Sequence, residues 1–231
     1  MIHSAKSVKG RARDENRDGV GVRFDGTRGL FVVVDGTSRP GSGQLAQALV
    51  DQILTLYCEK IAVGYSDSSH EEAGALLKEV LNDVHDRLFS TAFTGSASYL
   101  VGVATAGLLT VAYEGDCCAG VAFSNSPIIW FTAPHCLANW KRDRDHRQLA
   151  ADPARHRISR CFKARNKPDP EIVTRTTIEG EQLVFATDGF WADLSDATQA
   201  KLLEVEMLDP IHVDDDVSWI VVQSLPNNHL I

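Results

Sequence analysis

Residues 30–36, with the sequence Leu-Phe-Val-Val-Val-Asp-Gly, form an apolar run that ends abruptly in a carboxylate and a glycine. The β-branched and aromatic residues from Phe31 to Val34 predict a strand that is buried on both faces. Asp35 then stands at the end of this strand, and Gly36 allows the backbone to turn there. A carboxylate in this position is costly unless a positive charge compensates it, as a bound cation does. An ordinary Asp-Gly turn is the alternative.

The pattern returns later in the chain. Residues 183–189, Leu-Val-Phe-Ala-Thr-Asp-Gly, place Asp188 at the end of a second apolar strand. Further aspartates flank other strand-like runs: Asp18 before 19–24, Asp116 after 108–113, and the cluster 214–216 before 217–222. Divalent cations take oxygen ligands, and strand ends hold such ligands rigidly. We therefore expect these aspartates to converge on a metal site.

Six segments, taken in order, resemble the motifs of the PP2C (PPM) family of metal-dependent serine/threonine protein phosphatases. The segments are 10–18, 33–36, 94–97, 111–116, 187–191 and 215–218. Each motif alone has low specificity, but their order and approximate intervals match over nearly the whole chain. The resemblance is to the small bacterial type.

The resemblance implies an α+β fold, a four-layer α-β-β-α sandwich of two antiparallel sheets flanked by helices, formed by residues 1–231 as a single domain. Apolar residues at three- and four-residue steps predict a helix over 44–61 and a second helix that ends at Leu88. Ser69 or Ser68 is expected to cap the second helix. Shorter helices are expected over 138–150 and 195–203, and the tail 225–231 is expected to be loose. Strands are expected over 2–8, 20–24, 30–34, 97–106, 107–113, 117–123, 128–131, 171–176, 182–187 and 217–223.

Three strand arrangements follow from adjacency in the sequence. The strands 20–24 and 30–34 are expected to form a hairpin. The four strands between residues 97 and 131 are expected to form an antiparallel meander. The strands 171–176 and 182–187 are expected to form a hairpin that turns at Glu179-Gly180.

The resemblance also implies the metal ligands. Two Mg²⁺ or Mn²⁺ ions would share Asp35, with Asp188 and Asp215 holding one ion and the carbonyl of Gly36 helping to hold the other. Asp18 would act mainly through water.

Asp116 lies where some family members hold a third, weaker ion. The alternative for Asp116 is a simple turn residue.

The catalytic residues implied in this way are Arg13, Asp35 and Asp188. A guanidinium such as that of Arg13 binds phosphate with fixed paired donors. A water activated between the metal ions would attack phosphorus in line, so no protein nucleophile is needed. The implied activity is that of a Mg²⁺- or Mn²⁺-dependent hydrolase of phosphoserine and phosphothreonine in proteins.

Three departures from the family pattern bear on this activity. Arg17 stands where many members have Glu or Gln, and an arginine cannot bind a cation. Thr37 and Ser38 replace glycine, and Cys117-Cys118 replaces Ser-Arg. These departures leave open a catalytically inactive PP2C-like pseudophosphatase that acts as a binding or regulatory module. An unrelated metal hydrolase or cation-stabilised β protein is a further alternative.

Residues 132–170 are rich in charge and proline. A charge run of this kind is usually a solvated surface. The resemblance adds the alternative of a flap over the active site. In that case Arg155, Arg157, Arg160 and Lys163 would contact a phosphoprotein.

The overall composition limits the partners. The 231 residues carry a formal charge of −8, which argues against nucleic acid. No apolar run approaches the ~18 residues that a membrane span needs, and no signal peptide begins the chain. The five cysteines show no CxxC spacing, as expected of reduced thiols. We expect a cytoplasmic monomer whose partner is a phosphorylated protein, the target of a kinase.

Overall fold

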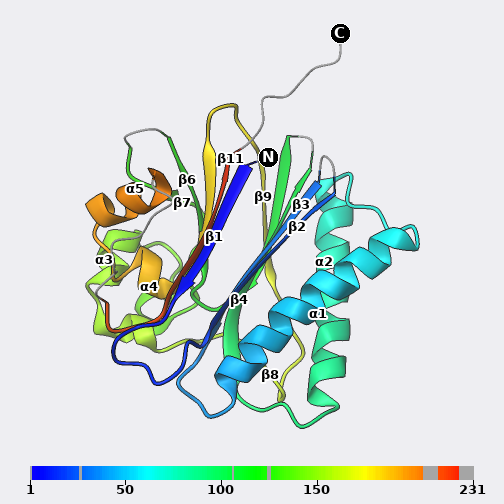
Figure 1. Cartoon of the computed structure of the whole chain (residues 1–231), viewed down its shortest axis with the longest axis horizontal. Coiled ribbons are helices and arrows are strands. Elements are labelled where there is room, and N and C mark those ends of the chain that lie inside the picture. The colour runs from blue at the N-terminus through cyan, green and yellow to red at the C-terminus, as the bar shows by residue number, and fades with distance from the viewer. Residues whose placement is uncertain (1, 26–27, 106, 124–125, 205–212, 224–231) are drawn as a thin grey trace.

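Two antiparallel sheets face each other at the centre of the molecule, and helices cover their outer faces (Figure 1). The computed structural model describes residues 2–25, 28–105, 107–123, 126–204 and 213–223, so the tail 225–231 lies outside them. The four-layer α-β-β-α arrangement expected from the sequence is confirmed.

Each sheet combines strands that are distant in the sequence. The first sheet has the strand order β1 (Ile2–Val8), β11 (Val217–Gln223), β10 (Gln182–Ala186), β6 (Cys118–Ala122) and β7 (Ile129–Trp130). The second has the order β2 (Asp18–Asp25), β3 (Arg28–Gly36), β4 (Ser96–Thr105), β5 (Leu108–Glu114) and β9 (Glu171–Thr176), with β8 (Phe162–Lys163) also paired to β4. The described pairs are all antiparallel.

Strand β3 is buried on both faces, as its apolar run predicts. Side chains alternate along a strand, so Leu30, Val32 and Val34 share one face. They pack with the long helices α1 (Ser42–Ala62) and α2 (His70–Phe89). The intervening Phe31 and Val33 enter the core between the two sheets. This double burial makes β3 the strand around which the second sheet is packed.

The helices close the two outer faces. Ser69 caps α2 in a capping box with Glu72, which satisfies free backbone N–H groups at the helix start. On the other side of the sandwich, α4 (Asp188–Trp191) contributes Phe190 to a cluster on the outer face of β10 and β11. The short helices α3 (His146–Ala150) and α5 (Asp196–Glu204) lie on the same side (Figure 1).

The hairpin expected from strands 20–24 and 30–34 is confirmed by the pairing of β2 with β3. The meander is wrong in part. Within the expected meander, β4 pairs with β5 and β6 pairs with β7, but β5 and β6 belong to different sheets. Gly115, with φ of +101°, lies in the link that takes the chain across. The second expected hairpin is also wrong, because β9 pairs with β5 whereas β10 lies between β6 and β11. Apolar alternation specifies a buried face but not the neighbouring strand.

The helix expected over 138–150 is replaced by two separate pieces. The 3₁₀ turn η1 (Leu137–Asn139) ends before Arg142, whose φ of 64° is left-handed. A new helix, α3, then begins where the Asp145 side chain accepts from the backbone N–H of Gln148. A second 3₁₀ turn, η2 (Pro153–His156), follows.

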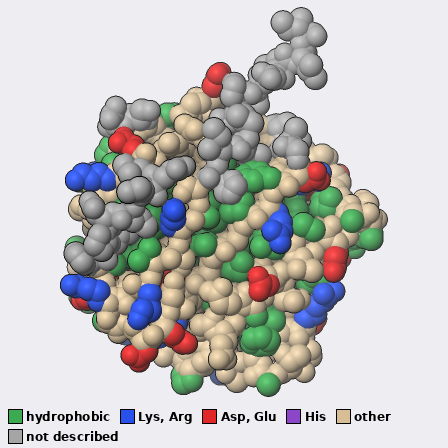
Figure 2. Space-filling model, viewed as in Figure 1, with side chains coloured by type: hydrophobic (Ala, Val, Ile, Leu, Met, Phe, Trp, Pro, Cys, Tyr) green, Lys and Arg blue, Asp and Glu red, His purple; other side chains and the backbone are tan. Residues whose placement is uncertain are grey.

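The surface agrees with the ordinary composition. On the face shown in Figure 2, basic and acidic side chains are interspersed rather than gathered by sign. Among the described residues, no helix combines the length and apolar character needed to span a membrane.

The core between the sheets generates a stability prediction. The rings of Phe31 and Phe185 stack across the sheets at 5.2 Å between centroids, and both side chains are fully buried. We expect Phe185→Ala to lower the free energy of unfolding by about 3–5 kcal/mol, through lost burial and a cavity. Urea denaturation followed by circular dichroism measures this. Val63→Ala, at a side chain that is 77% exposed, is the control, and equal small losses in both variants would contradict the prediction.

Candidate functional site

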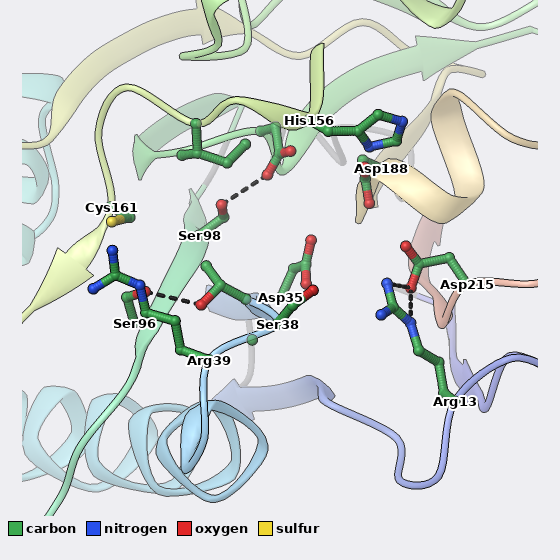
Figure 3. Close-up of a pocket in the computed structure, with 14 residues that line it drawn as sticks. Arg13, Asp35, Ser38, Arg39, Ser96, Ser98, His156, Cys161, Asp188 and Asp215 are labelled. Atoms are coloured by element: carbon green, nitrogen blue, oxygen red, sulfur yellow. Dashed lines mark hydrogen bonds and ion pairs between the residues drawn. The ribbon is translucent and has the colours of Figure 1, made fainter. Parts of the chain in front are cut away.

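A cavity of about 430 Å³ opens where the ends of both sheets meet. Figure 3 shows Asp35 near its middle, Arg13 with Asp215 at one end, and Arg39 at the other. The structure thus brings most of the expected site residues to one pocket: Arg13, Asp35, Gly36, Asp116, Asp188 and Asp215 line it.

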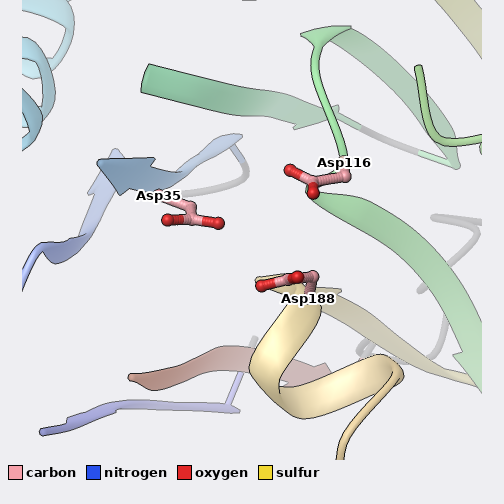
Figure 4. A group of neighbouring side chains, drawn as sticks. All are labelled: Asp35, Asp116 and Asp188. Atoms are coloured by element: carbon pink, nitrogen blue, oxygen red, sulfur yellow. The ribbon is translucent and has the colours of Figure 1, made fainter. Parts of the chain in front are cut away.

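Three carboxylates converge in this pocket (Figure 4). Asp35 lies near the end of β3, Asp116 in the link after β5, and Asp188 at the first position of α4. One oxygen from each lies within 4.8 Å of the others. This grouping is the geometry in which carboxylates bind a divalent cation together.

The Asp116 carboxylate is held by its surroundings. The Ser98 hydroxyl donates to it at 2.7 Å, and the Trp191 indole N–H donates to the Asp116 carbonyl at 2.8 Å. The preceding Gly115 approaches Ser98 so closely that a Cβ would collide with it. The Gly-Asp pair of the sequence is therefore required by packing as well as by the turn.

The Asp-Gly pair at 188–189 has a similar cause. A Cβ on Gly189 would collide with the backbone oxygen of Asp216, so only glycine lets α4 approach the start of β11. This contact places Asp188 beside the 214–216 segment.

The pKa values of these aspartates show how much negative charge the pocket concentrates. Desolvation raises the pKa of Asp35 well above its usual value, and the charges of Asp18, Asp188 and Asp116 raise it further. Burial and the charge of Asp188 raise the pKa of Asp116 to about 7. The donor set, all carboxylate oxygens with Asp35 lacking any described side-chain partner, fits a hard divalent cation.

Asp18 is placed differently from the group of three. It lies opposite Asp35 in the pairing of β2 with β3, is buried, and accepts from the Thr187 hydroxyl at 2.9 Å. Burial raises its pKa well above the usual value, while hydrogen bonds from Ser218 and Thr187 act in the opposite direction. A role for Asp18 as a metal ligand remains a prediction.

Two carboxylates of the segment 214–216, those of Asp215 and Asp216, have different partners. Asp215 lines the cavity and accepts from Arg13 through Nε at 2.7 Å, with Nη2 at 2.5 Å. Asp216 accepts from the backbone N–H groups of Gly10 and Arg17 at 2.9 and 2.8 Å. Asp216 therefore anchors the N-terminal loop that carries Arg13, a role that the sequence analysis did not assign.

The side chain of Arg17, the first departure from the family pattern, contacts the loop after β3. Its Nη1 donates to the Thr37 carbonyl at 3.4 Å, and its Nε lies 3.8 Å from a carboxylate oxygen of Glu15. It thus contributes packing of that loop and no oxygen ligand.

Arg155, from η2, is the site residue whose role the sequence analysis missed. Its side chain is 7% exposed, donates to Asp188 at 2.7 Å, and also pairs with Asp193. The expectation of a surface role for Arg155 is therefore wrong. Arg160 likewise pairs within the chain, with Glu114. A charge run carries no signal that distinguishes a buried arginine from its solvated neighbours.

Solved structures with a similar fold include bacterial serine/threonine phosphatases. The serine/threonine phosphatase Stp1 from Staphylococcus aureus matches with a TM-score of 0.77 and 17% identity, over 96% of this chain and 94% of that one. The Streptococcus agalactiae (S. agalactiae) serine/threonine phosphatase matches with a TM-score of 0.76 and 17% identity, over 96% and 98%. The catalytic domain of the phosphatase PstP, in complex with 2 manganese ions, matches with a TM-score of 0.67 and 15% identity, over 95% and 96%.

No family model and no curated protein matches the sequence. At the identities of the matching structures, the likeness establishes the fold. The chain has the sandwich of the PP2C-type phosphatases, as the sequence resemblance implied.

The crowded carboxylates predict an unusual dependence of stability on pH. Asp116 has a raised pKa, so the metal-free folded chain binds more protons than the unfolded chain, and stability falls as pH rises through about 7. Between pH 6.5 and 8, Asp116 alone contributes a loss of about 1 kcal/mol. The pKa values of His135 and His146 are lowered to about 4, so these groups add stability as pH rises until their unfolded forms have lost their protons, at about pH 7. They therefore oppose Asp116 in the lower part of this window, and only a comparison with an Asp116 variant isolates its contribution.

Thermal unfolding of the metal-free chain at constant ionic strength measures the effect. We expect the unaltered chain to lose about 1 kcal/mol more stability between pH 6.5 and 8 than Asp116→Asn does, and added Mn²⁺ to raise the melting temperature at pH 8. The same pH dependence in the unaltered chain and in Asp116→Asn would contradict the prediction.

The buried Arg155 pair generates a further prediction. Arg155→Gln leaves Asp188 and Asp193 without their described counter-ion, so we expect the metal-free chain to lose about 3 kcal/mol of unfolding free energy. Arg147→Gln, which removes the exposed ion pair with Asp196, is the matched control and costs less than about 1 kcal/mol. Urea titration compares the two variants, and equal losses would show that the Arg155 pair has no special weight.

Proposed function

We propose that the chain is a Mg²⁺- or Mn²⁺-dependent phosphatase of phosphoserine and phosphothreonine in proteins. The observation that carries this proposal is the convergence of Asp35, Asp116 and Asp188 beside Arg13, at the end of a sandwich shared with serine/threonine phosphatases. A phosphorylated protein, the product of a kinase, is the proposed substrate.

The residues available to hold metal are those that line the pocket. Asp35 is central to the proposal: it would hold metal together with Asp188, Asp215 and the Gly36 carbonyl, which line the same cavity. Asp18, opposite Asp35 in the pairing of β2 with β3, would act mainly through water. The PstP catalytic domain with 2 manganese ions supports this number of ions. Asp116 is the proposed ligand of a third ion.

Each residue then has a defined task. A divalent metal held by these residues would supply Lewis acidity and lower the pKa of a bound water, so that a nucleophile would be available at neutral pH. Arg13, oriented by Asp215, offers its remaining guanidinium donors to the substrate phosphate. Ser98 holds the Asp116 carboxylate in place, and Arg155 does the same for Asp188.

A cysteine mechanism has less support. Cys161 lines the cavity, but burial raises the pKa of its thiol, which disfavours the reactive thiolate. In the Cys-x5-Arg loop of cysteine phosphatases the arginine stands six positions after the cysteine, and here that residue is Lys167.

An inactive, PP2C-like binding module is the second candidate. Arg13 and Arg155 already neutralise Asp215 and Asp188, so part of the carboxylate charge is balanced within the chain itself. A site of this kind tolerates the loss of metal better than one with no internal cations.

Hydrolysis of a phosphothreonine peptide and of p-nitrophenyl phosphate, with Mn²⁺, Mg²⁺ or chelator, tests the proposal. We expect turnover to require metal and to fall at least about a hundredfold in Asp188→Asn, because a metal ligand is lost. Asp14→Asn is the matched control, because Asp14 belongs to the same N-terminal motif as Arg13 but is exposed.

The failed outcomes differ from one another. Calorimetric metal binding without turnover, abolished by Asp188→Asn, would favour the binding module. Neither turnover nor metal binding would overturn both candidates.

A further inference from the structure

The end of the cavity opposite Arg13 carries a second set of positive charges. Figure 3 shows the Arg39 side chain there, beside Cys161 and Ser96, with Asp35 between Arg39 and Arg13. Arg39 follows Thr37 and Ser38, in the loop where glycine is replaced. Its position in the pocket gives this departure a chemical consequence.

Lys163, in β8, does not line the cavity itself but lies opposite the cavity-lining Ser96 in the pairing of β8 with β4. Burial raises the pKa of the Cys161 thiol, and the positive charges of Lys163 and Arg39 both act in the opposite direction. Arg39 by its position in the cavity lining, and Lys163 by its pairing opposite Ser96, thus both lie at this end of the cavity. We call Arg39 and Lys163 the basic corner.

The basic corner differs from the other arginines of the site. Arg13 pairs with Asp215 and Arg155 pairs with Asp188, so carboxylates of the chain itself largely neutralise these two arginines. In the part of the chain that the structure describes, neither Arg39 nor Lys163 forms an ion pair or donates a side-chain hydrogen bond. Two unpaired cations beside one catalytic pocket, in a chain of net charge −8, are a binding surface for an anion.

The wall of the cavity between the basic corner and Asp35 is polar and uncharged. The hydroxyls of Thr37 and Ser96 lie 2.9 Å apart, and Ser96 and Ser98 both line the cavity. A substrate peptide that extends along this wall contacts hydrogen-bonding groups before it reaches the cations. The corner is thus set apart from the carboxylates that surround the reacting phosphate.

We propose that the basic corner is a subsite for an acidic side chain that neighbours the phosphorylated residue of the substrate. The proposal rests on the proposed phosphatase function and names its substrate class, phosphoproteins with Glu or Asp beside the target residue. A guanidinium suits this task because it binds a carboxylate through two parallel donors. Arg39 stands across Asp35 from Arg13, so it is the flanking group rather than the target phosphate that Arg39 binds.

Two phosphothreonine peptides test the proposal, identical except that Glu residues on both sides of the phosphothreonine are replaced by Gln. We expect kcat/KM of the unaltered chain to be about fivefold higher for the Glu peptide, as for an exposed ion pair, and to lose this preference in high salt. Arg39→Gln combined with Lys163→Gln brings the ratio of the two values to about one. Arg23→Gln with Arg165→Gln removes the same charge at exposed positions that do not line this cavity and keeps the ratio.

The subsite is overturned if the ratio of the two kcat/KM values stays unchanged in the Arg39 and Lys163 double variant, including the case in which both values fall by the same factor. An equal loss would assign Arg39 to the target phosphate instead. Binding of the same two peptides with a non-hydrolysable phosphonate, followed by fluorescence anisotropy, separates this from failure of the proposed function. If the chain shows no turnover, tighter binding of the Glu peptide that disappears when Arg39 and Lys163 are replaced would still support the subsite. Equal binding of the two peptides by the unaltered chain would overturn it.

Discussion

The mutual repulsion of carboxylates at one end of the sandwich is the constraint on which the rest of the structure depends. Asp35, Asp116 and Asp188 bring oxygens within 4.8 Å of one another. Two unit charges at that distance repel by about 3 kcal/mol at an effective dielectric constant of about 20. Burial and this repulsion raise the pKa values of Asp35 and Asp116, and Arg13 and Arg155 neutralise part of the negative charge. The remaining carboxylate oxygens form a donor set that fits a divalent metal ion.

The fold makes this concentration of charge possible by anchoring each aspartate to a rigid element. Phe31 and Phe185 lock the two sheets together at the centre, and Leu30, Val32 and Val34 hold β3 against the helices. The strand ends cannot move apart to relieve the repulsion without opening this core. Packing of the core thus offsets the repulsion between the carboxylates, as a rigid scaffold commonly does for a charged site.

The predictable part of the molecule is the part whose signal is local. The apolar run before Asp35 and the similar run before Asp188 identified buried strands and the residues at their ends, and the glycines after them follow from close packing. The partner of each strand was not predictable, because alternation describes one strand at a time. The expected hairpin of β9 and β10 failed for this reason. Arg155 was missed because its burial depends on η2 lying against α4, a contact that no periodicity encodes.

Anomalous diffraction from crystals grown with Mn²⁺ tests the central claim most directly. The account predicts manganese peaks in the pocket, with one bound to Asp35 and Asp188 and with Arg13 retained beside Asp215. An empty pocket at saturating Mn²⁺, with Arg155 still paired to Asp188, would contradict the account and show that arginine alone balances the carboxylates.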